Sequence, residues 1–335
     1  MRNQNNYFTF LCLLILSISS CVIKDAKIPS RQTVTIYSDC LTKDNELLFK
    51  ELKKNTGIKV QIIHLPTDTI LRRLKKQSFN SKADLVLLKS LFGIYKANKY
   101  DLLQPWRDNN FVGKNYKSAQ NTWAGIGIDP YIFLSKNDSC AEIESIGQLF
   151  FPENLDKWST HLETTSELIS MIAPILQRKT RKEVNEWIQS FKNDQHSQQN
   201  ELDRNGIPLM TTEVLFTNYS TYLKMLERND SLDMQIQLKF TNQNKRGAFY
   251  NMHCIGIVKQ ARNYYNAKLV VEYLYTPSVN EKLNAIWNTL PINMHKSIHP
   301  YAYQNTVFNL ALIYNENAMA NYPHISKSIK NTLKE

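Results

Sequence analysis

The first third of the chain alternates short apolar runs with amphipathic stretches, a pattern that predicts strands alternating with helices. The expected strands are 33–37, 59–64 and 83–88, and the expected helices are 43–56, 67–78 and 91–99. Gly57 follows the first helix at the position of a C-cap glycine. The run at 83–88 is continuously apolar, as in a buried parallel strand. This part of the chain therefore predicts an α/β fold with right-handed crossovers.

The pattern changes in the middle of the chain. Residues 122–134 hold two apolar strand-like runs, which we expect Asp129-Pro130 to separate, and Gly125 and Gly127 predict close backbone packing there. The other expected elements are helices at 145–150, 165–179, 181–192, 219–227, 261–275, 278–286 and 303–318, strands at 211–216 and 252–258, and a polar loop at 194–206.

The N-terminal residues have the pattern of an export signal. Arg2 precedes an apolar stretch at 8–18, which is too short to span a bilayer comfortably, and small residues then lead to Cys21. This arrangement resembles a bacterial lipoprotein signal, in which residues 1–21 end at the cysteine that carries the lipid. Residues 22–32 are then a polar tether. The alternative is an ordinary signal peptide that is cut elsewhere, with Cys21 incidental.

Charge and cysteine content narrow the function classes. The formal charge is +11, which in an exported protein favours anionic lipid headgroups or an anionic ligand over nucleic acid. The basic pairs Arg72-Arg73 and Lys75-Lys76 lie on a helical pattern and predict a solvated face. Beyond the signal, Cys40, Cys140 and Cys254 allow at most one disulfide, whose pairing stays open. The seven histidines lack zinc-site spacing.

Several blocks, in order along about residues 33–299, resemble the periplasmic ferric-iron-binding proteins and, more broadly, the type 2 solute-binding proteins of ABC importers. They include an Ala-Asp-Leu-Val strand, a Trp-Ala-Gly-Ile segment and a Leu-Pro-Ile-Asn segment. The blocks are 34–38, 56–60, 83–86, 123–126, 216–219, 273–278 and 290–293.

The resemblance implies a two-lobe α/β fold with a hinge of crossing strands. The first lobe would comprise 33–130 and 250–300, and the second 131–249 and 301–335. The ligand would lie in the cleft between the lobes, and the protein would dock on an ABC permease in the inner membrane. A monomer in the periplasm or cell envelope, without enzymatic activity, resident cofactor or nucleic-acid partner, is expected.

The residues that would bind ferric iron match only in part. Family members commonly use a His after the first strand, a Glu after the Ala-Asp strand and two adjacent tyrosines. Here Ser38-Asp39 follows the first strand, Lys89 stands in place of the Glu, and Tyr219 alone matches a tyrosine, with Tyr222 on the same helical face. The Lys89 ammonium repels bare Fe³⁺ and favours an organic phosphate, a carboxylate or a negatively charged iron chelate. Tyr219 is the one candidate metal ligand.

The candidate ligand-binding residues follow strands or begin helices. They are Ser38, Asp39, Lys89, Ser90, Trp123, Thr165, Ser166, Asn218, Tyr219 and Tyr222. The alternatives are helix capping for the polar residues and packing between lobes for Trp123. Tyr250 is expected to be structural. His253 and Cys254 are neighbours on a strand and should point to opposite faces, which disfavours a catalytic pair.

We therefore expect a solute-binding lipoprotein that captures iron as a chelate, or another anionic solute. The alternative in the same class is an organic-anion receptor of the phosphonate or thiamine type. A secreted hydrolase and a non-transport sensor lipoprotein represent other classes, although the chain has no GxSxG, P-loop or GxGxxG motif.

Overall fold

A computed structural model describes most of the chain from residue 33 onward. The described residues are 33–77, 80–106, 111–136, 143–150, 157–160, 169–170, 182, 185, 212–227, 236–244, 246–292, 308–311 and 322–333. Cys21, Cys140, Thr165 and Ser166, and the loop expected at 194–206, lie outside them. The residues described within the helices expected at 165–179 and 181–192 are helical.

The strands follow much of the predicted alternation. They are β1 (Thr33–Ser38), β2 (Lys59–His64), β3 (Leu85–Leu88), β4 (Leu103–Gln104), β5 (Trp123–Ser135), β6 (Trp158–Thr160), β7 (Val214–Asn218), β8 (Gln237–Phe240), β9 (Tyr250–Val258) and β10 (Leu290–Pro291). The α-helices are α2 (Lys50–Thr56), α3 (Thr67–Gln77), α4 (Leu91–Lys99), α7 (Tyr219–Leu226), α8 (Tyr264–Leu274), α9 (Pro277–Trp287) and α11 (Tyr322–Leu333), and the 3-10 helices are η1 (Lys43–Phe49), η3 (Lys114–Tyr116) and η5 (Ile146–Phe150).

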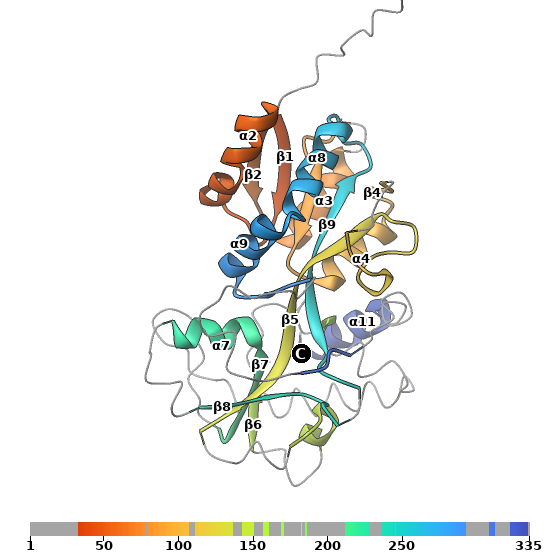
Figure 1. Ribbon diagram of the computed structural model, residues 1–335. Helices are drawn as coiled ribbons and strands as arrows, with labels where there is room; N and C mark the ends of the chain where they lie inside the picture. Colours follow the sequence, from red (N-terminus) through yellow and green to blue (C-terminus); the bar gives the residue numbers. More distant parts are fainter. Residues whose placement is uncertain are drawn as a thin grey trace, which may run out of the picture. The chain divides into compact units, whose positions relative to one another are not determined.

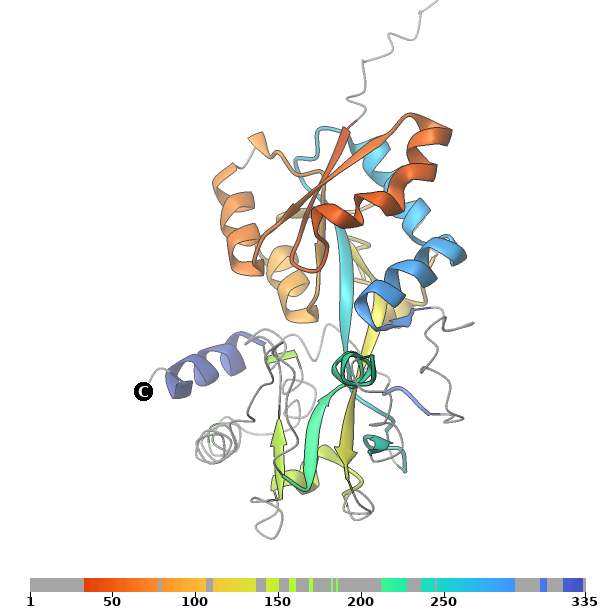
Figure 2. The same cartoon turned by 90° about the vertical axis from the view of Figure 1, so that its left-hand side faces the viewer.

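One mixed sheet runs through the described residues in the order β2-β1-β3-β9-β5-β7-β6. Strand β1 is parallel to β2 and β3, as the alternation predicts, whereas β9 is antiparallel to β3 and β5. In Figure 2, α3 and α4 lie on one side of the β1–β3 part and α2, α8 and α9 lie on the other. Covering both faces explains why Val34, Ile36 and all of β3 are apolar and buried.

The two longest strands, β5 and β9, lie side by side and connect the two halves of the sheet (Figure 1). Residues 123–130 of β5 pair with β9, and residues 131–135 pair with β7 and β8. The expected break at Asp129-Pro130 is therefore wrong. Pro130 pairs with Tyr250 of β9, but the bond to β9 at this point comes from the next residue, Tyr131, whose N–H donates to the Phe249 carbonyl at 2.9 Å. On the other edge Pro130 lies between the last pair with β10, at Ile128, and the first with β7, at Tyr131, so its missing N–H interrupts neither ladder.

The close packing predicted at the β5 glycines is confirmed. A Cβ at Gly127 would lie 2.1 Å from Asn284 Oδ1, and one at Gly125 would lie 2.3 Å from Met252 Sδ. The irregularity in the β5–β9 register falls between these two glycines. Side chains of helix α9 and strand β9 thus pack against the β5 backbone at these two glycines and leave no room for a Cβ.

Other expectations need correction. The helix expected at 43–56 begins as the 3-10 helix η1, and 145–150 is also 3-10 over η5. Part of the helix expected at 303–318 is not helical, because Leu310 forms a parallel bridge with Ala248. Strands β4, β6, β8 and β10 and helix α11 are not among the predicted elements; each of these strands has four residues or fewer, so alternation is a weak signal. Over the described residues, no helix has the length and apolarity that crossing a bilayer requires.

Candidate functional site

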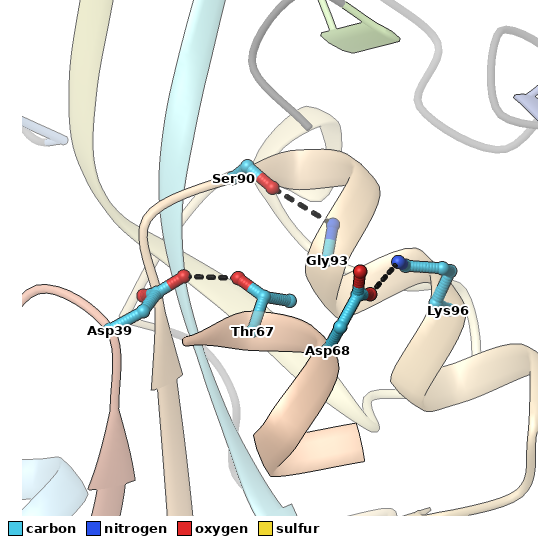
Figure 3. Close-up of polar contacts among 6 residues, drawn as sticks. All are labelled: Asp39, Thr67, Asp68, Ser90, Gly93 and Lys96. Atoms are coloured by element: carbon cyan, nitrogen blue, oxygen red, sulfur yellow. Dashed lines mark hydrogen bonds and ion pairs between the residues drawn. The ribbon is translucent and has the colours of Figure 1, made fainter. Parts of the chain in front are cut away.

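Asp39 lies just beyond the carboxyl end of β1, the edge at which open α/β sheets bind ligands. Its carboxylate accepts a hydrogen bond from the Thr67 hydroxyl at the start of α3 (Figure 3). It also accepts the Lys89 N–H at 2.7 Å. Burial raises the pKa of Asp39, and the hydrogen bonds and the Lys89 charge oppose that rise. Ser38 turns inward instead: its hydroxyl accepts the N–H groups of Cys40 and Leu41 and closes the turn.

The Lys89 backbone is fixed from two sides. Asp39 accepts its N–H, and the Asn251 side-chain amide of β9 donates to its carbonyl at 2.8 Å. The Lys89 charge acts on two buried carboxylates, Asp39 and Asp129, and opposes the rise of both pKa values. Lys89 is half-buried, so its ammonium brings a positive charge to this edge of the sheet, where it can attract an anion.

Two paired polar residues of the crossing strands hold two helix N-termini. Asp129 of β5 pairs directly with Asn251 of β9. The Asn251 oxygen accepts the Leu91 N–H at the start of α4 at 3.2 Å. The Asp129 carboxylate accepts the N–H of Ser220, near the start of α7, at 2.9 Å and the Ser220 hydroxyl at 2.7 Å. The hinge strands therefore position α4 and α7 relative to the same point of the sheet.

Asn218 completes the Asp129 cluster. Its side-chain amide donates to Asp129 at 3.0 Å, and among the described residues its buried Oδ1 has no hydrogen-bond partner. Burial raises the pKa of Asp129, which the bonds from Ser220 and Asn218 and the Lys89 charge oppose. We define Asp39, Lys89, Asp129, Asn218 and Asn251 as the polar centre.

Ser90 caps α4, as the capping alternative anticipates. Its hydroxyl accepts the Gly93 N–H at 3.0 Å (Figure 3), while the Phe92 N–H goes to the Ser170 hydroxyl at 3.2 Å. With Leu91 bonded to Asn251, the first three amides of α4 are all satisfied by protein groups. The first three backbone N–H groups of α4, beside Lys89, are therefore not available to a ligand.

The aromatic candidates are buried. Tyr219 is 4 % exposed, and its ring packs against Tyr222 at 6.1 Å and Phe240 at 5.8 Å between centroids. Trp123 is 1 % exposed at the start of β5, which fits the packing alternative. Tyr250, expected to be structural, is also buried, with its ring 6.2 Å from that of Tyr116.

The neighbouring His253 and Cys254 face different surroundings, as the strand alternation predicts. The His253 ring packs edge-on against Trp287 at 4.6 Å, while the buried Cys254 thiol donates to the Met252 carbonyl. Burial raises the pKa of Cys254 well above its ordinary value, so the thiol stays protonated. Cys254 and Cys40 are both free.

Sequence reasoning missed Asp129 and Asn251 as members of the site. In the sequence, Asp129 is interpreted only as part of a strand break, and Asn251 is not among the candidate residues. The available signal was a polar side chain within an otherwise apolar strand, which must find buried partners. Within the described residues, no group of three or more His, Cys, Asp and Glu could hold a metal ion.

We compared the sequence and the fold of this chain with those of known proteins. No protein-family model matches the chain. It is similar to Iron uptake protein A1 of Synechocystis sp., with 22 % identity over 256 residues, covering 73 % of this chain and 71 % of that protein. A Trichodesmium protein (IdiA, FutA), solved in complex with iron and citrate ligands, superimposes with a TM-score of 0.78 and 19 % identity over 90 % of this chain and 99 % of that one.

A second similar structure carries a different ligand. The periplasmic binding protein AfuA of Actinobacillus pleuropneumoniae, with exogenous fructose-6-phosphate bound, gives a TM-score of 0.66 at 16 % identity, over 90 % of this chain and 98 % of that one. The resemblance drawn from the sequence is therefore confirmed for the architecture: this chain has the two-lobe periplasmic binding protein fold of the ferric-ion-binding proteins.

Proposed function

We propose that this protein is the extracytoplasmic solute-binding component of an ABC importer, and that it captures iron as a negatively charged chelate. Similarity to an iron uptake protein over most of the chain, and to a protein solved in complex with iron and citrate ligands, supports iron as the cargo. The observation that selects a chelate is the polar centre, in which Lys89 stands at the end of β3 with its backbone bonded to Asp39 and Asn251.

The chelate reading follows from charge. A lysine ammonium repels Fe³⁺ but attracts the free carboxylates of citrate around it, and a charge-assisted hydrogen bond is worth about 1.5–3 kcal/mol. The Asn218 oxygen adds an acceptor for a ligand hydroxyl. Candidate contacts from the second lobe include Thr165, Ser166 and Tyr219, with Tyr219 as a phenolate ligand to the metal.

The proposed division assigns 33–130 and 250–300 to the first lobe and 131–249 and 301–335 to the second. Strands β5 and β9 are the hinge, because they pair with each other and β5 also pairs with β7 and β8 of the second lobe. In this arrangement Asp129 and Asn251 are the points about which α4 and α7 turn as the lobes close.

The remaining proposals concern location and partners. Lipidation at Cys21, with 22–32 as a tether, would keep the monomer beside its permease in the inner membrane. The protein would hand over its cargo without chemistry and without a resident cofactor. Vesicle flotation of the full chain and of Cys21→Ala tests the anchor, because the variant should lose membrane association.

The second candidate is a receptor for an organic anion such as a sugar phosphate. Lys89 suits a phosphate equally well, and a fructose-6-phosphate-bound protein shares the fold. A thermal-shift panel separates the two readings, since a ligand at 100 times its Kd stabilises the folded state by about 2.7 kcal/mol. We expect ferric citrate to raise the melting temperature more than citrate, phosphate or fructose-6-phosphate, and Tyr219→Phe to reduce the ferric citrate shift. A larger shift with the sugar phosphate, unchanged in Tyr219→Phe, would favour the second candidate and contradict the iron proposal.

A further inference from the structure

Helices α3 and α4 also wall a second concavity, apart from the polar centre. It encloses about 830 Å³, and part of its wall comes from Pro323 and Ser326 of α11. The sequence predicted only a solvated basic face on α3, but the fold turns that face into the side of a cavity. We call this space the α3–α4 pocket.

The α3–α4 pocket is strongly cationic. Its described lining carries five basic side chains, Arg72, Lys75, Lys76, Lys96 and Lys99, against one carboxylate, Asp68. Arg72 lies three and four residues before Lys75 and Lys76, and Lys96 lies three before Lys99, spacings at which like charges repel. A surplus of four positive charges around one concavity favours an anion that relieves the repulsion.

The single carboxylate is already engaged. Asp68 and Lys96 point toward one another from the two helices, with the Lys96 Nζ 2.6 Å from the Asp68 carboxylate (Figure 3). The Lys96 side chain is 16 % exposed, whereas that of Asp68 is 78 % exposed. Lys96 is therefore a fixed cation, and Asp68 competes with any incoming anion for it.

Aromatic rings hold the lysines in place. The Lys75 Nζ lies 3.0 Å from the Tyr100 ring centroid, and the Lys99 Nζ lies 5.9 Å from that of Tyr95. Tyr95 is in turn fixed edge-on by the fully buried Tyr322 of α11 at 5.2 Å. Rings and aliphatic stems give the pocket apolar surface beside its charges, which suits an organic anion better than a bare inorganic ion.

We propose that the α3–α4 pocket binds a phosphate ester, with Lys75 and Lys99 as its main contacts. That chemistry is shared by a soluble phosphate ester and by the glycerophosphate headgroup of an anionic phospholipid. A volume of about 830 Å³ admits either one. The α3–α4 pocket is a different place from the polar centre, because none of its described lining residues belongs to that centre.

Titration of the purified full chain at physiological salt tests the proposal. The soluble arm uses glycerol phosphate in a calorimeter, and the membrane arm uses sedimentation with phosphatidylcholine vesicles with or without phosphatidylglycerol. The pocket variant is Lys75→Gln with Lys99→Gln, both exposed in the native chain. The matched control is Lys53→Gln with Lys54→Gln on α2, which removes the same charge elsewhere.

We expect binding in at least one arm to weaken about 30-fold in the pocket variant and less than twofold in the control, since each cation near an anionic surface contributes a factor of about five. Asp68→Asn should tighten binding, because it removes the carboxylate that competes for Lys96. Binding of glycerol phosphate identifies a soluble ester, and binding only to phosphatidylglycerol vesicles identifies the headgroup. Absence of binding in both arms, or equal loss in the control variant, would overturn the proposal.

Discussion

Replacement of Asp129 by alanine should destabilise the protein more than any other single change in the polar centre. The carboxylate accepts three hydrogen bonds, from the Asn218 amide, the Ser220 N–H and the Ser220 hydroxyl. These donors join strand β5 to the start of α7. Asp129→Ala leaves these three donor groups without an acceptor in a buried site.

The magnitude follows from those contacts. A buried donor left without an acceptor costs about 1–3 kcal/mol, and relief of the desolvated carboxylate offsets part of the sum. We expect a loss of about 3 kcal/mol in the free energy of unfolding for Asp129→Ala. Asp129→Asn should lose only about 1 kcal/mol, because Asn218 can turn its unpartnered Oδ1 toward the new amide.

Urea unfolding followed by tryptophan fluorescence measures both values. Asp44→Asn is the matched control, since Asp44 is exposed on η1 and the change should alter stability by less than about 0.5 kcal/mol. A double-mutant cycle with Ser220→Ala should give a coupling energy of about 1–2 kcal/mol. A loss below about 1 kcal/mol for Asp129→Ala, or no coupling to Ser220, would refute the reasoning that this carboxylate holds α7.

Three further predictions concern packing, pH and thiol reactivity. Gly127→Ala should cost about 1–3 kcal/mol of stability in urea, because its Cβ would meet Asn284 Oδ1 at 2.1 Å, whereas Gly113→Ala, with its nearest neighbour at 3.8 Å, should be near neutral. Burial raises the pKa of Asp39 and Asp129, so the folded state binds their protons more tightly than the unfolded chain does. The free energy of unfolding should therefore fall as pH rises from about 4 through the raised pKa values. Asp129→Asn should show a shallower fall with pH, and a slope identical to that of the native chain would contradict this. Because its thiol is buried and has a raised pKa, Cys254 should resist alkylation in the native state and react after unfolding. Peptide mass mapping measures both, and rapid alkylation of Cys254 in the native protein would contradict the burial of this thiol.

The sequence predicts the local elements of the first lobe well. Strands β1, β2 and β3 and helices α3 and α4 begin and end within two residues of the predicted positions, because apolar periodicity and burial agree there. The path of β5 could not be predicted. A proline normally ends a strand, and its tolerance at Pro130 depends on the partners that β5 acquires from β7, β9 and β10, far away in sequence.

In the candidate site, too, the sequence predicts what depends on neighbouring residues and misses what depends on contacts between residues far apart in the chain. Asp39 and Lys89 were found because they follow strands whose ends meet at one sheet edge. The role of Ser90 depended on whether its hydroxyl faced Gly93 or the cleft, which spacing alone does not decide. The pairing of Asp129 with Asn251 required the register of two strands that lie far apart in the sequence.

The affinity of the full chain for ferric citrate, compared with citrate alone, tests the central claim most directly. Calorimetry of the native chain, Lys89→Gln and Lys89→Glu should show ferric citrate binding weakened at least about tenfold by Lys89→Gln and further by Lys89→Glu, since each removes a charge-assisted hydrogen bond. Unchanged melting temperatures without ligand would show that both variants fold. Equal or tighter ferric citrate binding in Lys89→Glu would contradict the account, because it would mean that Lys89 does not select an anionic chelate.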